Sequence, residues 1–469
     1  MSETLLSVGI DIGTSTTQLV LSRLTIENQA NPFSVPRVAI TGREIVYRSA
    51  VHFTPLFDER TIDAERVRAI VAEEYRKAGI ERDQVETGAV IITGETARKE
   101  NAAQVLSVLS EFAGDFVVAT AGPDLESILA ARGAGADRLS EEKHGSVLNF
   151  DVGGGTANLA LFDRGRLAAT GCYDIGGRLI RYGDRIDYVA PVLEGRFPGV
   201  ERGAPPDRKA LEGAAEDMAA VLAQAAGLTA PDNRLEHYAT AGAAGPRPFC
   251  PDYITFSGGV ADCLWSPPED WRVYGDLGPL LGRAVREAFA PAGERLVRGA
   301  ETIRATVVGA GSHSTELSGS TIFYREVSFP LKNLPILRLE PEEERLAPGE
   351  LARVLREKLG WYADQGGQVQ LALGLRGFHS PGYSQVAALA EGLAQGLGEW
   401  TAAGYFPVLV LEEDMAKALG QALAQRLPGP ILCLDGVAAG QGDYIDVGTP
   451  VANGAVLPVV IKTLAFQKM

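Results

Sequence analysis

The sequence predicts an α/β protein made of two similar blocks followed by a third α/β unit. Two observations carry this prediction. Apolar runs rich in β-branched residues alternate with stretches of helical periodicity, and one order of these elements occurs twice before about residue 325. Beyond that point short strands and helices alternate, which is typical of βαβ units. We therefore expect domains at 1–145, 146–325 and 326–469, a number that suits a chain of 469 residues.

The first block opens with two apolar runs, at 5–12 and 16–24, joined by a turn of Gly, Thr and Ser residues, and this pattern predicts a β-hairpin. A helix is expected at 63–78, because its apolar residues recur at helical spacing and Gly79 provides a stop. The other elements predicted for this block are a strand within 35–50, a strand at 88–93, a helix near 97–113, a strand at 116–120 and a helix near 123–133.

The second block repeats this order of elements. Turn sequences recur at matching places, DIGTSTTQ with DVGGGTAN and IITGETA with TFSGGVA, so an internal duplication is the simplest account. The elements predicted for this block are strands at 146–151, 157–163 and 166–173, a helix at 208–226, a strand at 253–257, a helix near 277–290 and a strand at 303–308.

The third unit is expected to be a small α/β domain. Its tail, from Asp435 onward, carries turn signals at regular spacing and is expected to form hairpins. The elements predicted before the tail are strands at 334–339, 367–373, 407–411 and 430–434, and helices near 347–360, 383–398 and 413–427.

Composition and charge narrow the classes of function. With 60 Asp and Glu against 44 Lys and Arg, the net charge of −16 opposes binding to phosphate backbones, so we expect no nucleic-acid partner. The four cysteines are far apart and lack CxxC spacing, which indicates neither a disulfide framework nor a zinc site and is typical of a reducing cytosol. The start lacks a signal-peptide pattern and no run of 18 apolar residues occurs, so we expect a cytoplasmic protein without a membrane contact.

Two turns carry the chemistry: SVGIDIGTSTTQLVL at 7–21 and VLNFDVGGGTANLALF at 147–162. A tight turn without bulky side chains lets backbone N–H groups approach phosphate oxygens, and hydroxyl groups add donors. One such turn is more often ordinary turn chemistry, whereas two turns with the same placement of Asp are hard to dismiss. The candidate phosphate-binding residues are Gly13, Thr14, Ser15, Thr16, Gly153, Gly154, Gly155 and Thr156.

Each of these turns follows a single aspartate, and a third turn completes the predicted site. Asp11 and Asp151 are metal candidates, because Mg²⁺ is commonly held through one or two carboxylates plus waters and phosphates. The segment YITFSGGVADC at 253–263 ends a strand in Gly258 and Gly259, where the backbone can lie against a flat base and ribose. A plain strand-to-helix turn is the alternative reading of this segment.

The order of phosphate hairpin, small-residue helix, second phosphate hairpin and Gly-Gly turn resembles the actin, hexokinase and Hsp70 superfamily over roughly residues 5–320. The resemblance implies an actin-like ATPase fold, in which two duplicated RNase H-like domains close on Mg-ATP. It implies that the helix at 122–134 is the first interdomain helix. The second interdomain helix is then either 278–289 or 309–319. In this reading Asp11 holds the metal, and Asp151 is the first choice for positioning the attacking water.

A closer resemblance extends over nearly the whole chain. The sequence is similar to the ethanolamine ammonia-lyase reactivating factors, the EutA family, and this implies an ATP-dependent chaperone that releases inactivated cobalamin from ethanolamine ammonia-lyase so that intact coenzyme can bind. A homo-oligomer and association with a bacterial microcompartment are both compatible with this resemblance. The segments that carry the resemblance are ITGETARKENA (92–102), AGPDLESILAARGAGA (121–136), ITFSGGVADC (254–263), VVGAGSHSTELSGSTI (307–322) and DYIDVGTPVANGAVLPVVIKTLAF (443–466).

Two other classes of protein share the predicted fold. A small-molecule kinase would need a base for the acceptor hydroxyl and a substrate pocket between the lobes, and the fold alone excludes neither. A filament-forming relative would usually need a membrane or polymer contact, and no basic amphipathic helix ends this chain. The unit at 326–469 has no motif for chemistry, so docking to the lyase or stabilisation of the lobes is expected of it.

Overall fold

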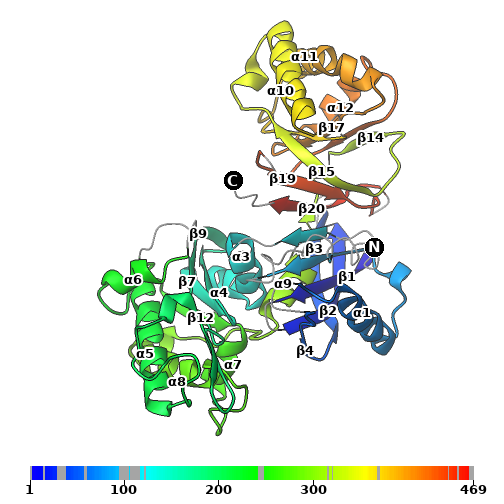
Figure 1. Ribbon diagram of the computed structural model, residues 1–469. Helices are drawn as coiled ribbons and strands as arrows, with labels where there is room; N and C mark the ends of the chain where they lie inside the picture. Colours follow the sequence, from blue (N-terminus) through cyan, green and yellow to red (C-terminus); the bar gives the residue numbers. More distant parts are fainter. Residues whose placement is uncertain are drawn as a thin grey trace.

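The computed structural model places two lobes side by side and a third unit above them (Figure 1). No helix among the residues it describes is long and apolar enough to cross a membrane. The described residues are 3–13, 16–28, 38–57, 61–93, 105, 117–120, 123–240, 248–313, 316–319, 321–366, 370–441, 443–451 and 454–463.

The first lobe is built on one mixed sheet with the strand order β3-β2-β1-β5-β6. Strand β2 pairs antiparallel with both β1 and β3, whereas β5 runs parallel to β1 and β6 runs parallel to β5. The predicted hairpin and the strands that follow it are thereby confirmed. The strands are β1 (Glu3–Ile12), β2 (Thr16–Asn28), β3 (Val38–Arg48), β4 (His52–Phe53), β5 (Thr87–Ile92) and β6 (Val117–Thr120).

Helix α1 (Ala64–Ala78) covers one face of this sheet and confirms the helix predicted at 63–78. Asp63 caps its first turn by accepting a hydrogen bond from the backbone N–H of Arg66 at 3.1 Å. Gly79 ends it in the left-handed conformation, with φ of 66°. The predicted helix near 97–113 lies outside the described residues, apart from Val105.

The second lobe repeats the arrangement of the first. Its sheet has the order β12-β7-β8-β9, with β7, β8 and β9 antiparallel and β12 parallel to β7. The strands are β7 (Ser146–Val152), β8 (Ala157–Asp163), β9 (Arg166–Tyr173) and β12 (Tyr253–Ser257), with a separate pair β10 (Ile180–Tyr182) and β11 (Ile186–Val189). The helices are α5 (Arg208–Ala225), α6 (Asn233–His237), α7 (Gly259–Trp265) and α8 (Gly278–Ala288).

Two helices cross between the lobes. Helix α3 (Pro123–Gly133) follows the first sheet but packs on β7, β8 and β9, together with α4 (Ala136–Glu142). Helix α9 (Ala305–His313) follows the second sheet but packs on β1, β2, β5 and α3. Each lobe therefore carries a helix that belongs in sequence to the other block.

Helix α9 overturns one prediction and decides another. The strand predicted at 303–308 is wrong, because most of that segment forms the start of α9. Its apolar run is buried on several sides at once, and such a run does not distinguish a strand from a buried helix. Of the two candidates for the second interdomain helix, 278–289 forms α8, which packs on α5 and α7, whereas 309–319 overlaps α9.

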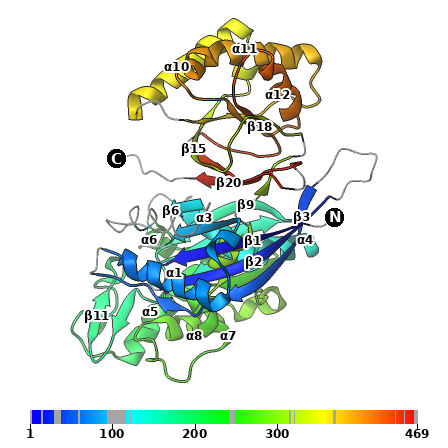
Figure 2. The same ribbon diagram turned by 90° about the vertical axis from the view of Figure 1, so that its right-hand side faces the viewer.

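The third unit has four parallel strands, β15 to β18, extended by antiparallel strands at both edges. Figure 2 shows its three helices on the side away from β20. The predicted strand at 367–373 begins later than expected, and 367–369 lie outside the described residues. The elements are β13 (Glu316–Leu317), β14 (Phe323–Arg325), β15 (Leu331–Arg338), α10 (Pro348–Gly366), β16 (Ala372–Leu375), α11 (Tyr383–Ala402), β17 (Val408–Leu411), α12 (Ala416–Ala424), β18 (Ile431–Leu434), β19 (Asp443–Val447) and β20 (Pro458–Thr463).

Apolar contacts attach the third unit to the first lobe. Val451 and Val456 pack with Leu5, Leu24 and Ile26 at the ends of β1 and β2. Because these side chains form one buried cluster, the third unit is packed directly on the first lobe at this edge.

Candidate functional site

The two predicted phosphate turns have the same backbone geometry. In the first, the N–H of Gly13 donates to the carbonyl of Thr16 at 2.8 Å, and in the second the N–H of Gly153 donates to the carbonyl of Thr156 at 3.0 Å. Thr14 and Ser15, at the tip of the first turn, lie outside the described residues. Two turns that close in the same way, each at the end of the first strand of its lobe, are what the duplication predicts.

The tip of the second turn presents free backbone donors. The N–H groups of Gly154 and Gly155 bond to no other residue of the described part of the chain. The carbonyls of the turn are engaged instead, because Gly177 N–H donates to the Gly153 oxygen at 2.9 Å and Arg178 N–H donates to the Gly154 oxygen at 2.7 Å. Fixed carbonyls and free N–H groups suit an anionic group at this tip.

Asp11 lies one residue before the end of β1 and is 8% exposed. The hydroxyl of Thr93 donates to its carboxylate at 2.9 Å. Burial raises the pKa of Asp11 to about 7; the hydrogen bond from Thr93 opposes this shift, and the charge of Asp151 adds to it. The two aspartates, one from each lobe, are therefore close enough to interact electrostatically.

Asp151 occupies the corresponding place in β7 and is 5% exposed. Burial raises the pKa of Asp151 to about 6, against hydrogen bonds from Ser257 and Thr306. The Ser257 hydroxyl donates at 2.7 Å and itself accepts from the Asn149 amide at 2.9 Å. Thr255 donates to Asn149 at 2.9 Å, so a chain of buried hydrogen bonds leads to the carboxylate.

Gly258 is in a conformation that favours glycine. Its φ is 84°, and a Cβ built on it would lie 2.3 Å from the carbonyl oxygen of Val152, at the end of β7. Its N–H donates to Thr302 at 3.0 Å, and Gly259 begins α7. The Gly-Gly turn thus packs closely against the strand that carries Asp151.

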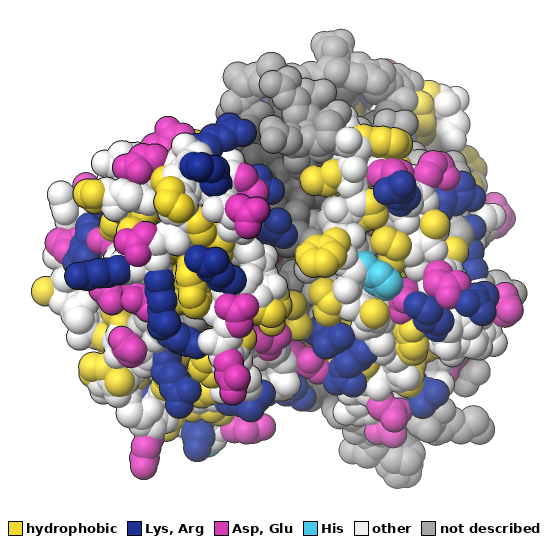
Figure 3. Space-filling view, turned by 60° about the horizontal axis from the view of Figure 1, so that its bottom comes forward, with side chains coloured by type: hydrophobic (Ala, Val, Ile, Leu, Met, Phe, Trp, Pro, Cys, Tyr) yellow, Lys and Arg dark blue, Asp and Glu magenta, His cyan; other side chains and the backbone are white. Residues whose placement is uncertain are grey.

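The entrance to α9 joins the two hairpins. The Gln18 amide, opposite Asp11 in the β1–β2 pair, donates to the Ile303 carbonyl at 3.2 Å. The Arg304 guanidinium donates to the Ser49 carbonyl at 3.1 Å. Figure 3 shows that the surface is hollowed between the two lobes. On the side of the second lobe, the Thr302 carbonyl accepts from Gly258 and Thr306 hydrogen-bonds to Asp151, so this segment links the first hairpin to the second hairpin and the Gly-Gly turn.

The acidic residues suit a hydrated cation better than a cage of protein ligands. Among the described residues no group of three or more His, Cys, Asp and Glu side chains could hold a metal ion. Mg²⁺ does not need such a cage, since it commonly binds one or two carboxylates and keeps waters. The buried Gln18 Oε1 beside Asp11 has no hydrogen-bond partner among the described residues, and such an acceptor fits a bound water.

Several residues around the predicted site are not among the predicted site residues, although Thr93 and Ser257 lie within the quoted turns IITGETA and TFSGGVA. Thr93 and Ser257 donate to the two aspartates, and the loop at 176–178 fixes the second turn. One available signal is the duplication, because Gln18 and Asn158 stand opposite Asp11 and Asp151 in the two hairpins. The loop at 176–178 has no counterpart in the quoted motifs of the first block.

Binding of Mg-ADP is expected to weaken as the pH falls from about 7 to below about 6. Ionised carboxylates attract the cation, and burial raises the pKa of Asp11 to about 7 and that of Asp151 to about 6. Ser257→Ala removes a hydrogen bond that favours the ionised form, so the midpoint should rise by about 0.5 to 1 pH unit. Calorimetric titration of Mg-ADP between pH 5.5 and 8.5 measures this shift.

Thr255→Val is the matched control for Ser257→Ala. It breaks a hydrogen bond of 2.9 Å to Asn149 in the same buried chain but does not touch the carboxylate of Asp151. The midpoint should therefore stay at its original pH in Thr255→Val. An equal shift in both variants would show that general loosening of the lobe, and not the bond to Asp151, sets the pH dependence.

Two sheets of one topology, joined by exchanged helices, form the actin-like ATPase fold that the sequence predicts. The chain belongs to the family described as ethanolamine utilisation protein EutA, whose match spans residues 3–467. It is 39% identical to the ethanolamine ammonia-lyase reactivase EutA of Escherichia coli (strain K12) over 475 residues, and this covers 98% of each chain. The protein of the same name from Salmonella typhimurium is 38% identical over 472 residues, again covering 98% of each chain.

Similar solved structures include a Ppx/GppA family member from Aquifex aeolicus. The match covers 66% of this chain and 97% of the Aquifex chain, with a TM-score of 0.40 and 14% sequence identity.

Proposed function

We propose that this protein is an ATP-dependent reactivase of ethanolamine ammonia-lyase, which releases inactivated cobalamin from that enzyme in the cytoplasm. The observation that carries the proposal is the 39% identity, over 98% of both chains, to a relative named for this activity. The local geometry supports the ATP dependence, because both phosphate turns of the fold are present and each follows a buried aspartate.

ATP is proposed to bind between the lobes. Gly13 and Thr16 of the first turn, with Thr14 and Ser15, would face the phosphates from one side, and Gly153, Gly154, Gly155 and Thr156 from the other. The free N–H groups of Gly154 and Gly155 support this assignment. The tight turn at Gly258 and Gly259 would lie along the adenosine.

The two aspartates are proposed to differ in role. Asp11 would hold Mg²⁺ together with water, and the unpartnered Oε1 of Gln18 supports a water there. Asp151 would accept a hydrogen bond from the attacking water and orient it, and its raised pKa of about 6 leaves it ionised at neutral pH. When bound, Mg²⁺ supplies charge stabilisation for the phosphoryl group.

The exchanged helices provide a route from nucleotide to client. Because α3 and α9 contact each other and each packs on the lobe opposite its own block, a change in lobe closure must alter their packing. The nucleotide can shift an equilibrium between open and closed lobes only by binding one state more tightly. We propose that domains 1–145 and 146–325 open and close in this way. The domain at 326–469, packed on the first lobe, would dock to the lyase.

The proposal is tested by measuring recovery of activity in an inactivated lyase. Ethanolamine ammonia-lyase inhibited with cyanocobalamin is incubated with the protein, MgCl₂ and adenosylcobalamin, with ATP, with ADP or without nucleotide. Lyase activity should return only with ATP, and a control without the protein should stay inactive. Recovery without ATP would contradict the role of the nucleotide. Hydrolysis of ATP, or phosphorylation of a small acceptor, without recovery of the lyase would contradict the proposed client.

A further inference from the structure

A cavity of about 460 Å³ lies in the third unit, far in sequence from the interlobe site. Strands β15, β16 and β17 run parallel, and the walls come from the segments that follow them: 341–346, 376–379 and Glu413. Gln385 and Leu389, in the first turns of α11, complete it. Open α/β sheets bind ligands outside the carboxyl ends of their strands, so this is a favourable place for a ligand site.

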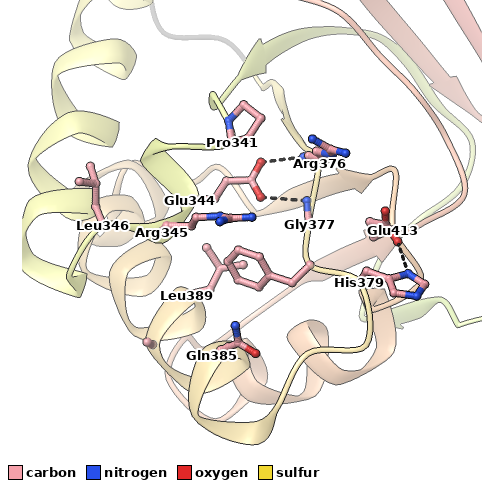
Figure 4. A pocket seen from close by; sticks show the side chains of 12 residues that line it. Pro341, Glu344, Arg345, Leu346, Arg376, Gly377, His379, Gln385, Leu389 and Glu413 are labelled. Carbon is pink, nitrogen blue, oxygen red and sulfur yellow. Dashed lines mark hydrogen bonds and ion pairs between the residues drawn. The ribbon is translucent and has the colours of Figure 1, made fainter.

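Glu344 holds two walls of the pocket together. Its side chain accepts hydrogen bonds from the backbone N–H groups of Arg376 at 2.7 Å and Gly377 at 2.8 Å (Figure 4). The residue is only 3% exposed. Burial raises the pKa of Glu344, and the two N–H groups oppose that shift. These two hydrogen bonds connect the turn after β15 to the end of β16. Arg345 and Arg376 therefore both line the pocket.

The lining groups supply hydrogen-bond donors in excess of acceptors. The guanidinium groups of Arg345 and Arg376 have no ion pair or hydrogen bond with any other described residue, and Arg345 reaches into the space between Glu344 and Leu389 (Figure 4). Gln385 Oε1 already accepts from the Gly382 N–H at 3.0 Å, which leaves its NH₂ group to donate.

The carboxylates of the pocket are already engaged. The bonds from two N–H groups occupy Glu344, and His379 Nδ1 lies 3.1 Å from the carboxylate of Glu413. Two guanidinium groups and an amide donor thus remain for a ligand, which must bring acceptors, and an ionised acceptor makes the stronger bond to a guanidinium group. Part of the lining is apolar, since buried Leu389 and half-buried Leu346 and Phe378 contribute to it.

We propose that this pocket binds a small organic oxyanion, a phosphate ester or a carboxylate that carries an apolar group. The oxyanion lies against the guanidinium groups of Arg345 and Arg376, and the apolar group packs on Leu346, Phe378 and Leu389. A cavity of about 460 Å³ has room for a ligand of metabolite size. The site is separate from the proposed ATP site and goes beyond the reactivase function.

Phenyl phosphate, benzoate and phenol are suitable probes, because they share a ring and differ in charge. Each is titrated into the full-length protein and followed by ligand-observed NMR. Phenyl phosphate or benzoate should bind, whereas phenol should not, and the tighter of the two anions identifies the source of the oxyanion. Arg345→Gln and Arg376→Gln should each weaken binding by about 10-fold or more, and Arg345→Lys should restore part of the loss.

Arg353→Gln is the matched control, since Arg353 lies on α10 of the same unit and its side chain is 63% exposed. It removes the same charge outside the pocket and should bind the anion as the wild type does. The proposal is overturned if neither anion binds, if phenol binds equally well, or if all three Arg→Gln variants bind the anion alike. The last outcome would place the anion elsewhere, for instance between the lobes.

Discussion

Asp151→Asn is expected to abolish ATP-dependent recovery of the lyase and at the same time to make the protein more stable at neutral pH. The loss of activity should be at least about 100-fold, because a positioned carboxylate that orients the reacting water contributes on that scale. The fold should persist, since Asn offers an oxygen to the Ser257 hydroxyl that donates to Asp151 at 2.7 Å.

The gain in stability follows from the sign of the pKa shift. Burial raises the pKa of Asp151 from 3.8 to about 6, so folding favours the protonated form. That contribution to stability is complete below about pH 4 and is lost as the pH rises through about 6. Above pH 7 the wild type must bury a charge that Asn lacks. The difference in the free energy of unfolding should be at most about 3 kcal/mol.

Urea unfolding at pH 4 and pH 8, without divalent cations, measures this difference. Asp151→Asn should be more stable than the wild type at pH 8 and similar to it at pH 4. Asp163→Asn, an exposed aspartate at the end of β8, is the control and should change neither stability nor recovery of the lyase. Equal stability of Asp151→Asn and wild type at pH 8 would contradict the account of a costly buried carboxylate.

The two hairpins can be predicted from the sequence, but the hydrogen bonds to the aspartates cannot. Each hairpin is a local structure whose turn residues are adjacent in the chain, and the duplication doubles the signal. Thr93 and Ser257 occupy matching places in the repeated turns IITGETA and TFSGGVA. They reach the aspartates from neighbouring parallel strands, so their hydrogen bonds depend on strand order and register, which the repeat does not give.

The pocket of the third unit shows the same limit in stronger form. Its lining comes from four separate segments, and Arg345 and Arg376 are brought together by hydrogen bonds from backbone N–H groups to Glu344. Backbone contacts of this kind leave no pattern of residue types. Helix α9 is a third case, because its small and apolar residues suit a buried strand equally well and only packing against α3 decides between them.

Gly309→Ala is expected to damage both stability and recovery of the lyase, because helices α3 and α9 touch through their backbones. A Cβ on Gly309 would lie 1.9 Å from the carbonyl oxygen of Leu129, and a Cβ on Gly133 would lie 1.9 Å from that of Ala305. A carbonyl cannot yield as a flexible side chain can, so the helices must separate. Such overpacking typically costs about 1 to 3 kcal/mol.

Gly213→Ala is the matched control, because Gly213 lies within α5 and a Cβ there would meet no atom within 4 Å. The same substitution should stabilise by about 0.5 to 1 kcal/mol at this position, where only helix propensity acts. Urea unfolding of both variants therefore isolates the effect of the helix crossing. A neutral Gly309→Ala would mean that α3 and α9 are not in backbone contact in solution.

Recovery of the lyase adds information that unfolding alone does not give. If the crossing transmits lobe closure, Gly309→Ala should lose more recovery than ATP hydrolysis, since the hairpins and Asp151 lie on other elements and α9 bonds to Asp151 through Thr306, before Gly309 in the helix. Small-angle scattering with and without Mg-ADP would then show a smaller change in radius of gyration than in the wild type. Parallel losses of hydrolysis and recovery would indicate damage to the nucleotide site itself. The ratio of the two activities therefore separates a helix crossing that couples the lobes from one that only holds them together.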